Sequence, residues 1–123
     1  AASDVYKRQI ILGGTIKHST QAVIGSVAIE QLKKYSFDIC FVGCNGIDET
    51  FGVTTAEENE AFIKATAIKN SKRKYILADK SKFGHRKFQK FAELDDVTIV
   101  SYEVPKEYKR YKNIIEVKNL KED

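Results

Sequence analysis

Histidine and cysteine are scarce in this chain of 123 residues, which has two of each and no methionine or tryptophan. Three residues separate Cys40 from Cys44, and no further Cys or His gathers around them, so neither a zinc site nor a disulfide framework is indicated. His18 and His85 also lack a companion at the spacing of metal ligands, and we interpret both as surface residues. We therefore expect reduced thiols, no metal and no cofactor.

Long apolar runs are also missing. No stretch of 18 apolar residues occurs, which excludes a membrane-spanning helix. The N-terminal region lacks the apolar stretch and small-residue cleavage site of a signal peptide, so we expect a cytoplasmic protein. With 42% hydrophobic and 31% charged residues, the chain is long enough for one globular domain and too short for two ordinary cores.

Lysine and arginine are absent between Ser36 and Ile63, where six acidic residues lie. Lys64 to Lys90 has the opposite balance, with ten basic residues and one acid, Asp79. Such a basic block is typical of a solvated face, a nucleic-acid surface or the wall of an anion pocket, and we favour a solvated face for most of these lysines. The bases are spread over a helix end, a strand and a loop, so direct DNA reading is not predicted, while nonspecific phosphate contact stays open.

Apolar runs of strand length alternate with helical patterns, which predicts an α/β fold with a largely parallel sheet and flanking helices. Strands are expected at 9–12, 37–42, 75–78, 97–100 and 113–117. Helices are expected at 20–35, from a capping-box pattern at 54–55 to 70, and at 87–92, with a helical turn from 105 to 111. The strand at 37–42 is nearly all apolar, which is typical of a central parallel strand buried on both faces.

Three short loops follow expected strands, namely Gly13-Gly14, Asn45-Gly46-Ile47-Asp48 and Asp79-Lys80-Ser81-Lys82. Ligands of open α/β sheets bind beyond the carboxyl ends of the strands, where these loops are expected to meet. Glycines allow close backbone approach, the start of a following helix offers free amide donors, and a lysine supplies positive charge. A small phosphorylated molecule would use all three features.

An ordered set of motifs runs through much of the chain. It reads Leu12-Gly13-Gly14, Gly25, Asp38-Ile39-Cys40-Phe41-Val42-Gly43, Asn45-Gly46-Ile47-Asp48, Gly52-Val53-Thr54-Thr55, Glu60, Lys64 and Leu77-Ala78-Asp79-Lys80-Ser81-Lys82-Phe83-Gly84. No single motif is specific, but the ordered set resembles the C-terminal effector domain of DeoR/GlpR-type transcriptional regulators. Within that family it is most similar to the fructose-operon repressor branch.

This resemblance implies the fold of ribose-5-phosphate isomerase and glucosamine-6-phosphate deaminase, and a sensor for a phosphorylated sugar, with fructose 1-phosphate favoured. Such sensors follow an N-terminal winged helix-turn-helix, and their effector changes the affinity of the whole homo-oligomer for operator DNA. Residues 1–8 do not resemble the family and are expected to be a non-native or unrelated leader, with a partial sensor domain over 9–123. The DNA-binding module and the first part of the sensor are expected to be missing.

The loops and the resemblance together suggest a set of ligand-binding residues and no catalytic residue. The set is Gly13, Gly14, Asn45, Gly46, Asp48, Thr54, Thr55, Glu60, Lys64, Asp79 and Lys82. Several of these residues could serve the fold instead of the ligand, since an aspartate such as Asp48 caps turns and threonines cap helices. Glu60 and Lys64 also have the spacing of a surface ion pair worth about 0.3 kcal/mol, and Lys80 is expected at the surface.

Two further hypotheses stay open. A small sugar-phosphate isomerase would use Asp48, Glu60 and Lys82. However, Asn45 stands where the related isomerases have an aspartate, and their following Lys-Gly-Gly-Gly stretch has no match. These losses bear on catalysis more than on binding, because isomerisation needs a base and groups that stabilise an enediolate. A domain that serves mainly in oligomerisation is the third hypothesis.

Overall fold

A computed structural model describes residues 9–118 of the chain, so the expected leader, residues 1–8, lies outside the described residues. The strands and helices in chain order are β1 (Thr15–Lys17), β2 (Ala22–Ile24), α1 (Ser26–Leu32), β3 (Phe37–Gly43), β4 (Gly46–Asp48), β5 (Gly52–Thr55), α2 (Glu58–Lys69), β6 (Ser71–Leu77), β7 (Gln89–Ala92), β8 (Thr98–Ser101) and β9 (Ile114–Glu116). Three short 3-10 helices are η2 (Lys80–Lys82), η3 (Leu94–Asp96) and η4 (Lys106–Tyr108). Within this part of the chain, no helix is long and apolar enough to cross a membrane.

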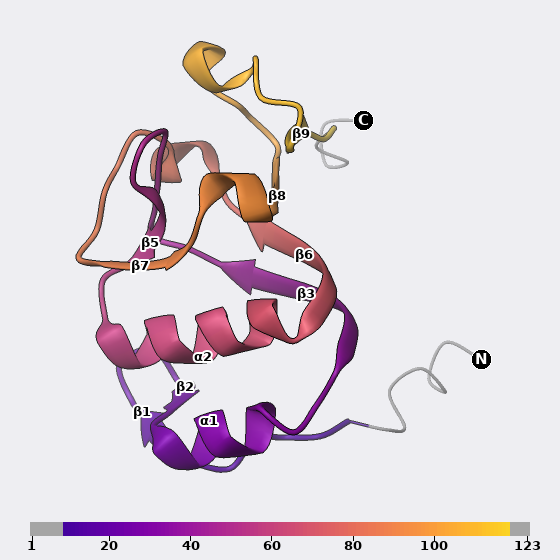
Figure 1. Cartoon of the computed structure of the whole chain (residues 1–123). Coiled ribbons are helices and arrows are strands. Elements are labelled where there is room, and N and C mark those ends of the chain that lie inside the picture. The colour runs from indigo at the N-terminus through magenta and orange to yellow at the C-terminus, as the bar shows by residue number, and fades with distance from the viewer. Residues whose placement is uncertain (1–8, 119–123) are drawn as a thin grey trace.

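Four parallel strands form the main sheet in the order β3-β6-β8-β9. A three-stranded antiparallel sheet, β4-β5-β7, lies beside the carboxyl end of β3, and β1 and β2 form a separate hairpin next to α1 (Figure 1). The α/β fold with a largely parallel sheet is therefore confirmed.

The core lies on one side of the main sheet. Ile76 and Ile99 of that sheet are completely buried and belong to one cluster with Ile47 and Val53 of the antiparallel sheet and with Ala61 of α2. Figure 1 shows α2 running between α1 and the strands, and α2 contacts both sheets as well as α1. The apolar residues of the chain thus hold α2 and the two sheets together.

Helix α2 begins three residues later than its sequence pattern suggests. Thr54 and Thr55 lie in β5, so neither caps the helix, and the carboxylate of Glu57 takes that role by accepting the N–H of Asn59 at 3.1 Å. The reason is that β5 pairs on both edges, with β4 and β7, and this pairing holds the two threonines extended. Acidic residues lie in the first turn of α2 and Lys69 lies in the last, which matches the helix dipole.

Three other expectations about the elements are wrong. Residues 9–12 form no strand, and the helix expected at 20–35 is shortened to α1, because Ala22–Ile24 pairs with Thr15–Lys17 as a hairpin. Residues 87–92 contain strand β7 instead of a helix, since Gln89–Ala92 pairs with β5. The strands predicted at 75–78, 97–100 and 113–117 are confirmed as β6, β8 and β9 within a few residues, and the turn after Pro105 is confirmed as η4.

Strand β3 is present as predicted, but it is not a central strand buried on both faces. Within the described residues it lies at the edge of the main sheet, with β6 as its neighbour in that sheet. Ile39 and Phe41 of β3 are exposed, while Cys40 and Val42 pack against the core. Within residues 9–118, the face of the main sheet that carries Ile39 and Phe41 is therefore apolar and exposed.

Candidate functional site

A hollow of about 370 Å³ opens at the carboxyl ends of β3, β6 and β8, the edge at which open α/β sheets bind ligands. We call it the strand-end hollow. Its lining residues are Gly43, Cys44, Leu77, Ala78, Asp79, Lys82, Val100, Ser101, Tyr102 and Val117. Leu77, Val100 and Val117 make part of this lining apolar, while Asp79, Lys82 and Ser101 contribute polar groups to it.

A tight turn after β6 positions Lys82 at this rim. The Asp79 carboxylate accepts hydrogen bonds from the N–H of Ser81, at 2.9 Å, and from the Ser81 hydroxyl, and so caps η2. These two bonds hold the pKa of Asp79 below its usual range, with the hydroxyl as the larger cause. Lys82 lines the hollow, whereas Lys80 forms an ion pair with Glu103 at 3.2 Å and lies on the surface as expected.

The floor of the hollow contains a buried thiol next to two lysines. Burial raises the pKa of Cys44 to about 11, and the charges of Lys64 and Lys82 oppose that rise. Lys64 reaches this region from α2, where its ammonium lies 5.4 Å from the centre of the Phe91 ring. Burial lowers the pKa of Lys64, and the nearby Glu60 carboxylate partly restores it. Two cations, Lys64 and Lys82, thus act on the same small region, and Cys44 is too strongly protonated to be a nucleophile at neutral pH.

The side chains of the Asn45–Thr55 region are engaged within the protein. The Asn45 side-chain oxygen accepts the Thr55 hydroxyl at 2.6 Å and the N–H of Ala56 at 3.3 Å. The Thr54 hydroxyl donates to the Gly46 carbonyl at 3.3 Å and accepts the N–H of Lys87 at 2.9 Å. Both threonines are fully buried. These bonds hold β4, β5 and the 84–87 loop together at the side of the hollow.

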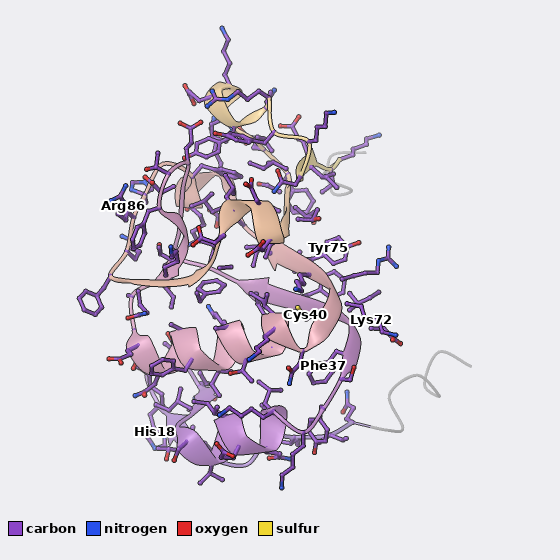
Figure 2. The ribbon with its side chains drawn as sticks, in the orientation of Figure 1. His18, Phe37, Cys40, Lys72, Tyr75 and Arg86 are labelled. Carbon is purple, nitrogen blue, oxygen red and sulfur yellow. The ribbon has the colours of Figure 1, made fainter. Side chains whose placement is uncertain are left out.

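Asp48 closes the turn between β4 and β5. One of its oxygens accepts the N–H of Phe51 at 2.7 Å, the hydroxyl of Thr50 at 2.9 Å and the guanidinium of Arg86 at 3.0 Å. These contacts lower the pKa of Asp48 to about 2, the Phe51 N–H being the largest cause. In Figure 2, Arg86 lies on the loop next to this turn, on the side of the molecule away from Tyr75.

Asp48→Asn is expected to lower the free energy of unfolding at neutral pH by about 1 kcal/mol, because the amide keeps the turn but loses the charge-assisted bond to Arg86. A carboxylate with a depressed pKa stabilises the native state above its ordinary pKa, and that contribution disappears as the pH falls from about 4 through about 2. Urea unfolding of both proteins across this range should show the difference shrinking toward pH 2. A difference that does not change with pH would contradict this role for Asp48.

The remaining predicted residues lie elsewhere. The N–H of Gly13 donates to the Gln31 side chain at 2.7 Å, and Gly14, at φ 147°, is packed against Ile24 and Ala28, so the glycine pair lies beside α1. Glu60 accepts the hydroxyl of Thr20 at 3.2 Å, at the β1–β2 turn. Neither Glu60 nor the glycine pair lines the strand-end hollow.

Among the predicted residues, the structure thus brings Asp79 and Lys82 together at the hollow, while Lys64 acts on the buried Cys44 by its charge and does not line the hollow. The sequence analysis does not single out Ser101, Tyr102 or Val117, which also line it. Ser101 ends β8, and Val117 directly follows β9, so their position at strand ends is the signal that could have found them. No group of three or more His, Cys, Asp or Glu residues in the described part of the chain could hold a metal ion.

A sequence model of the DeoR C-terminal sensor domain matches residues 3–102 of the chain. The match begins inside the expected leader, so that boundary stays a prediction. It covers every element from β1 to β8, including the turn that holds Lys82.

Three curated relatives are transcriptional regulators by name. The uncharacterized HTH-type transcriptional regulator FruR of Bacillus subtilis (strain 168) is 44% identical over 91 residues, which are 74% of this chain and 36% of the relative. The HTH-type transcriptional regulator GlpR of Haloferax volcanii is 34% identical over 89 residues, 72% of this chain and 35% of the relative. The lactose phosphotransferase system repressor of Staphylococcus aureus (strain NCTC 8325) is 32% identical over 112 residues, 89% of this chain and 44% of the relative. The chain therefore spans less than half the length of these relatives.

Proposed function

The chain belongs to the family of DeoR C-terminal sensor domains, and from this premise we propose that it binds a phosphorylated sugar in the strand-end hollow. Fructose 1-phosphate is the effector we favour. The identity of 44% to a regulator named FruR supports this choice among sugar phosphates. In a complete regulator, the bound effector would change the affinity of a winged-helix module for operator DNA in the cytoplasm.

One observation carries the proposal, namely the lysine held at the rim of an apolar hollow. Lys82 lines the hollow next to the Asp79–Ser81 turn, whereas Lys64, whose charge acts on Cys44, does not line it. A phosphate dianion would gain a charge-assisted hydrogen bond from the Lys82 ammonium. The Asp79 carboxylate is suited to accept a sugar hydroxyl, and the Ser101 hydroxyl, which donates to the Glu103 carbonyl at 3.0 Å, would accept one, while Leu77 and Val100 would pack against the carbon skeleton.

The contacts of the acidic candidates favour binding over catalysis. An aldose–ketose isomerase needs a base within hydrogen-bond reach of the substrate. Glu60 is bonded to Thr20 outside the hollow, and the Asp48 oxygen is engaged by the turn and by Arg86. We therefore propose a sensor without enzymatic activity, in which the effector acts by favouring one arrangement of a homo-oligomer.

Calorimetric titration of the chain with fructose 1-phosphate, glycerol 3-phosphate, ribose 5-phosphate and inorganic phosphate tests the proposal. We expect saturable binding of the sugar phosphates at submillimolar to millimolar concentration, tightest for fructose 1-phosphate and weakest for inorganic phosphate, which has no carbon skeleton to pack. Absence of binding by all four compounds would refute the proposed binding of a phosphorylated sugar in the strand-end hollow of this chain. Turnover of ribose 5-phosphate that is abolished by Glu60→Gln would favour the isomerase instead.

A further inference from the structure

A second hollow, of about 450 Å³, lies at the opposite end of the main sheet from the strand-end hollow, where α1 and α2 end and β3 and β6 begin. Figure 1 shows these four ends at one side of the molecule, and Figure 2 shows Lys72 there, beside Phe37. We call it the lysine hollow and define it by its lysines, Lys33, Lys34, Lys69 and Lys72. None of its lining residues is acidic, so the surface is strongly positive.

Asn70 joins the segments that carry these lysines. Its side-chain amide donates to the carbonyls of Leu32, at 3.4 Å, and Lys33, at 3.3 Å. Its own carbonyl accepts the N–H of Phe37 at 2.9 Å. These bonds hold the end of α1, the end of α2 and the start of β3 together, and two of the lysines lie on either side of Asn70 in the sequence. The lysines of α1 and α2, far apart in the chain, are thus brought to one place by hydrogen bonds.

Little within the described residues neutralises these charges. Lys33 contacts Glu30 at 3.3 Å, and Lys72 contacts Asp38 at 3.9 Å. The side chains of Lys72 and Asp38 are 76% and 92% exposed, and pairs of this kind contribute little to stability. The other two lysines of the hollow form no ion pair within residues 9–118. Ammonium groups are therefore available to an anion from outside.

Helix dipoles explain part of this cluster, because lysines are favourable at the carboxyl ends of helices. Each helix end carries about half a negative charge, so α1 and α2 together supply about one. Arg73 and Lys74 continue the basic run along β6, and Asp95 and Asp96 line the neighbouring hollow, which bounds the positive surface on that side. Between these aspartates and α1, the six basic residues exceed the two contacting acids and the two dipoles by about three charges.

The other polar groups of the lysine hollow are already used by the fold. The Asn70 amide is bonded to the end of α1, and the hydroxyl of the buried Ser71 donates to the Ala67 carbonyl at 2.7 Å. Helix carboxyl ends present carbonyl groups, whereas a small anion is held by the N–H groups of a helix amino end. Exposed ammonium groups without fixed donors favour a polyanion that is contacted at several of its charges.

We propose that the lysine hollow contacts the phosphate backbone of duplex DNA without reading its sequence. Each DNA strand has a phosphate every 3.4 Å or so of the helix axis, so several ammonium groups can be engaged at once. Such contacts position a protein on the duplex and carry no sequence information. The choice of DNA among polyanions rests on the proposed role of the chain in a regulator that holds operator DNA. The strand-end hollow stays open, because it lies at the other end of the sheet.

Fluorescence anisotropy of a labelled duplex of about 20 base pairs, titrated with the chain at about 25 to about 200 mM NaCl, tests this contact. We expect a dissociation constant of micromolar to submillimolar size, whose logarithm depends on that of the salt concentration with a slope of about 3 in magnitude. Lys34→Gln combined with Lys69→Gln should weaken binding at least about fivefold at about 50 mM NaCl and reduce the slope by about 2, since two phosphate contacts are lost. Circular dichroism verifies that this double variant remains folded.

Lys80→Gln combined with Lys106→Gln is the matched control. Both lysines are exposed and lie in η2 and η4, beyond the carboxyl ends of β6 and β8, so the same charge is removed far from the lysine hollow. Its dissociation constant should stay within about twofold of the parent value. If both double variants weaken binding equally, only the net charge attracts DNA, which overturns the proposal. Absence of binding at about 25 mM NaCl also overturns it.

Two further titrations separate this site from other anion sites. Tripolyphosphate that binds more tightly than the duplex, and that Lys34→Gln with Lys69→Gln abolishes, would make the lysine hollow a site for a compact anion and overturn DNA as its ligand. Fructose 1-phosphate should bind this double variant as it binds the parent chain. A chain that binds the duplex as described but no sugar phosphate would contradict the proposed function alone, so the two failures are distinguishable.

Discussion

Replacing Gly46 by alanine is expected to lower the free energy of unfolding by about 3 kcal/mol, which is a large effect for a single methyl group. A Cβ at this position would lie 2.5 Å from the His85 carbonyl oxygen and 2.8 Å from the Thr54 hydroxyl. Neither neighbour can move freely, because the N–H of Gly84 is bonded to the Ile47 carbonyl at 2.8 Å and Thr54 is fully buried. Urea unfolding followed by circular dichroism measures the loss.

Gly43→Ala is the matched control for this substitution. Gly43 lies three residues earlier at the end of β3, and a Cβ there would meet nothing within 4 Å. Its unfolding free energy should therefore change by no more than about 0.5 kcal/mol. Equal stability of Gly46→Ala and the parent chain would show that the 84–86 loop is not packed on Gly46. The strong expected effect on folding separates Gly46 from residues whose substitution would affect effector binding alone.

Lys82→Ala is expected to weaken binding of fructose 1-phosphate at least about tenfold, with little change in stability. The reason is that a charge-assisted hydrogen bond to phosphate contributes more than about 1.4 kcal/mol, whereas Lys82 is partly exposed and contributes little to the core. Calorimetric titration of parent and variant at one ionic strength measures the ratio of dissociation constants. Both titrations need the same salt concentration, because dissolved salt screens the attraction between lysine and phosphate in both proteins.

Lys80→Ala provides the control two residues away in the same 3-10 helix. The Lys80 ammonium is directed to Glu103 and is not among the groups that line the hollow, so its removal deletes the same charge without the proposed contact. We expect its dissociation constant to stay within about twofold of the parent value, the change that a screened distant charge produces. If the two variants weaken binding equally, the effect is general electrostatic attraction and the proposed contact of Lys82 is wrong.

Local sequence patterns are sufficient to predict most of the strands whose ends form the strand-end hollow. β3, β8, β9 and the second half of β6, residues 75–77, are short apolar runs, and these runs predict the four strands within a few residues, whereas the basic first half of β6 is not predicted. The Asp79–Lys82 turn was also placed correctly beyond the end of β6, since an aspartate that accepts the N–H two residues later is a local interaction.

Patterns with helical spacing gave wrong expectations where part of the segment pairs as a strand. The helical spacing over 20–35 was divided by the β1–β2 hairpin, and 87–92 became a strand through its pairing with β5. Gly13-Gly14 was expected at the hollow and lies beside α1, because residues 9–12 do not enter the main sheet. An amino-acid pattern of this length fits a helix or a strand, and pairing decides between them.

The sequence by itself determined the family, the α/β class and the lysine-bearing turn at the end of a parallel strand, because these depend on local residue order and short-range hydrogen bonds. Only the tertiary structure decided which of the predicted ligand-binding residues lie close together. It joined Cys44, Asp79 and Lys82 around one hollow, and engaged Asn45, Thr54 and Thr55 in bonds that hold two strands and a loop. Within residues 9–118 it also left the Phe41 side of the main sheet exposed, which an all-apolar strand pattern does not reveal. The physical reason is that burial and proximity are set by long-range packing, whereas turns and strand propensity are set within a few residues.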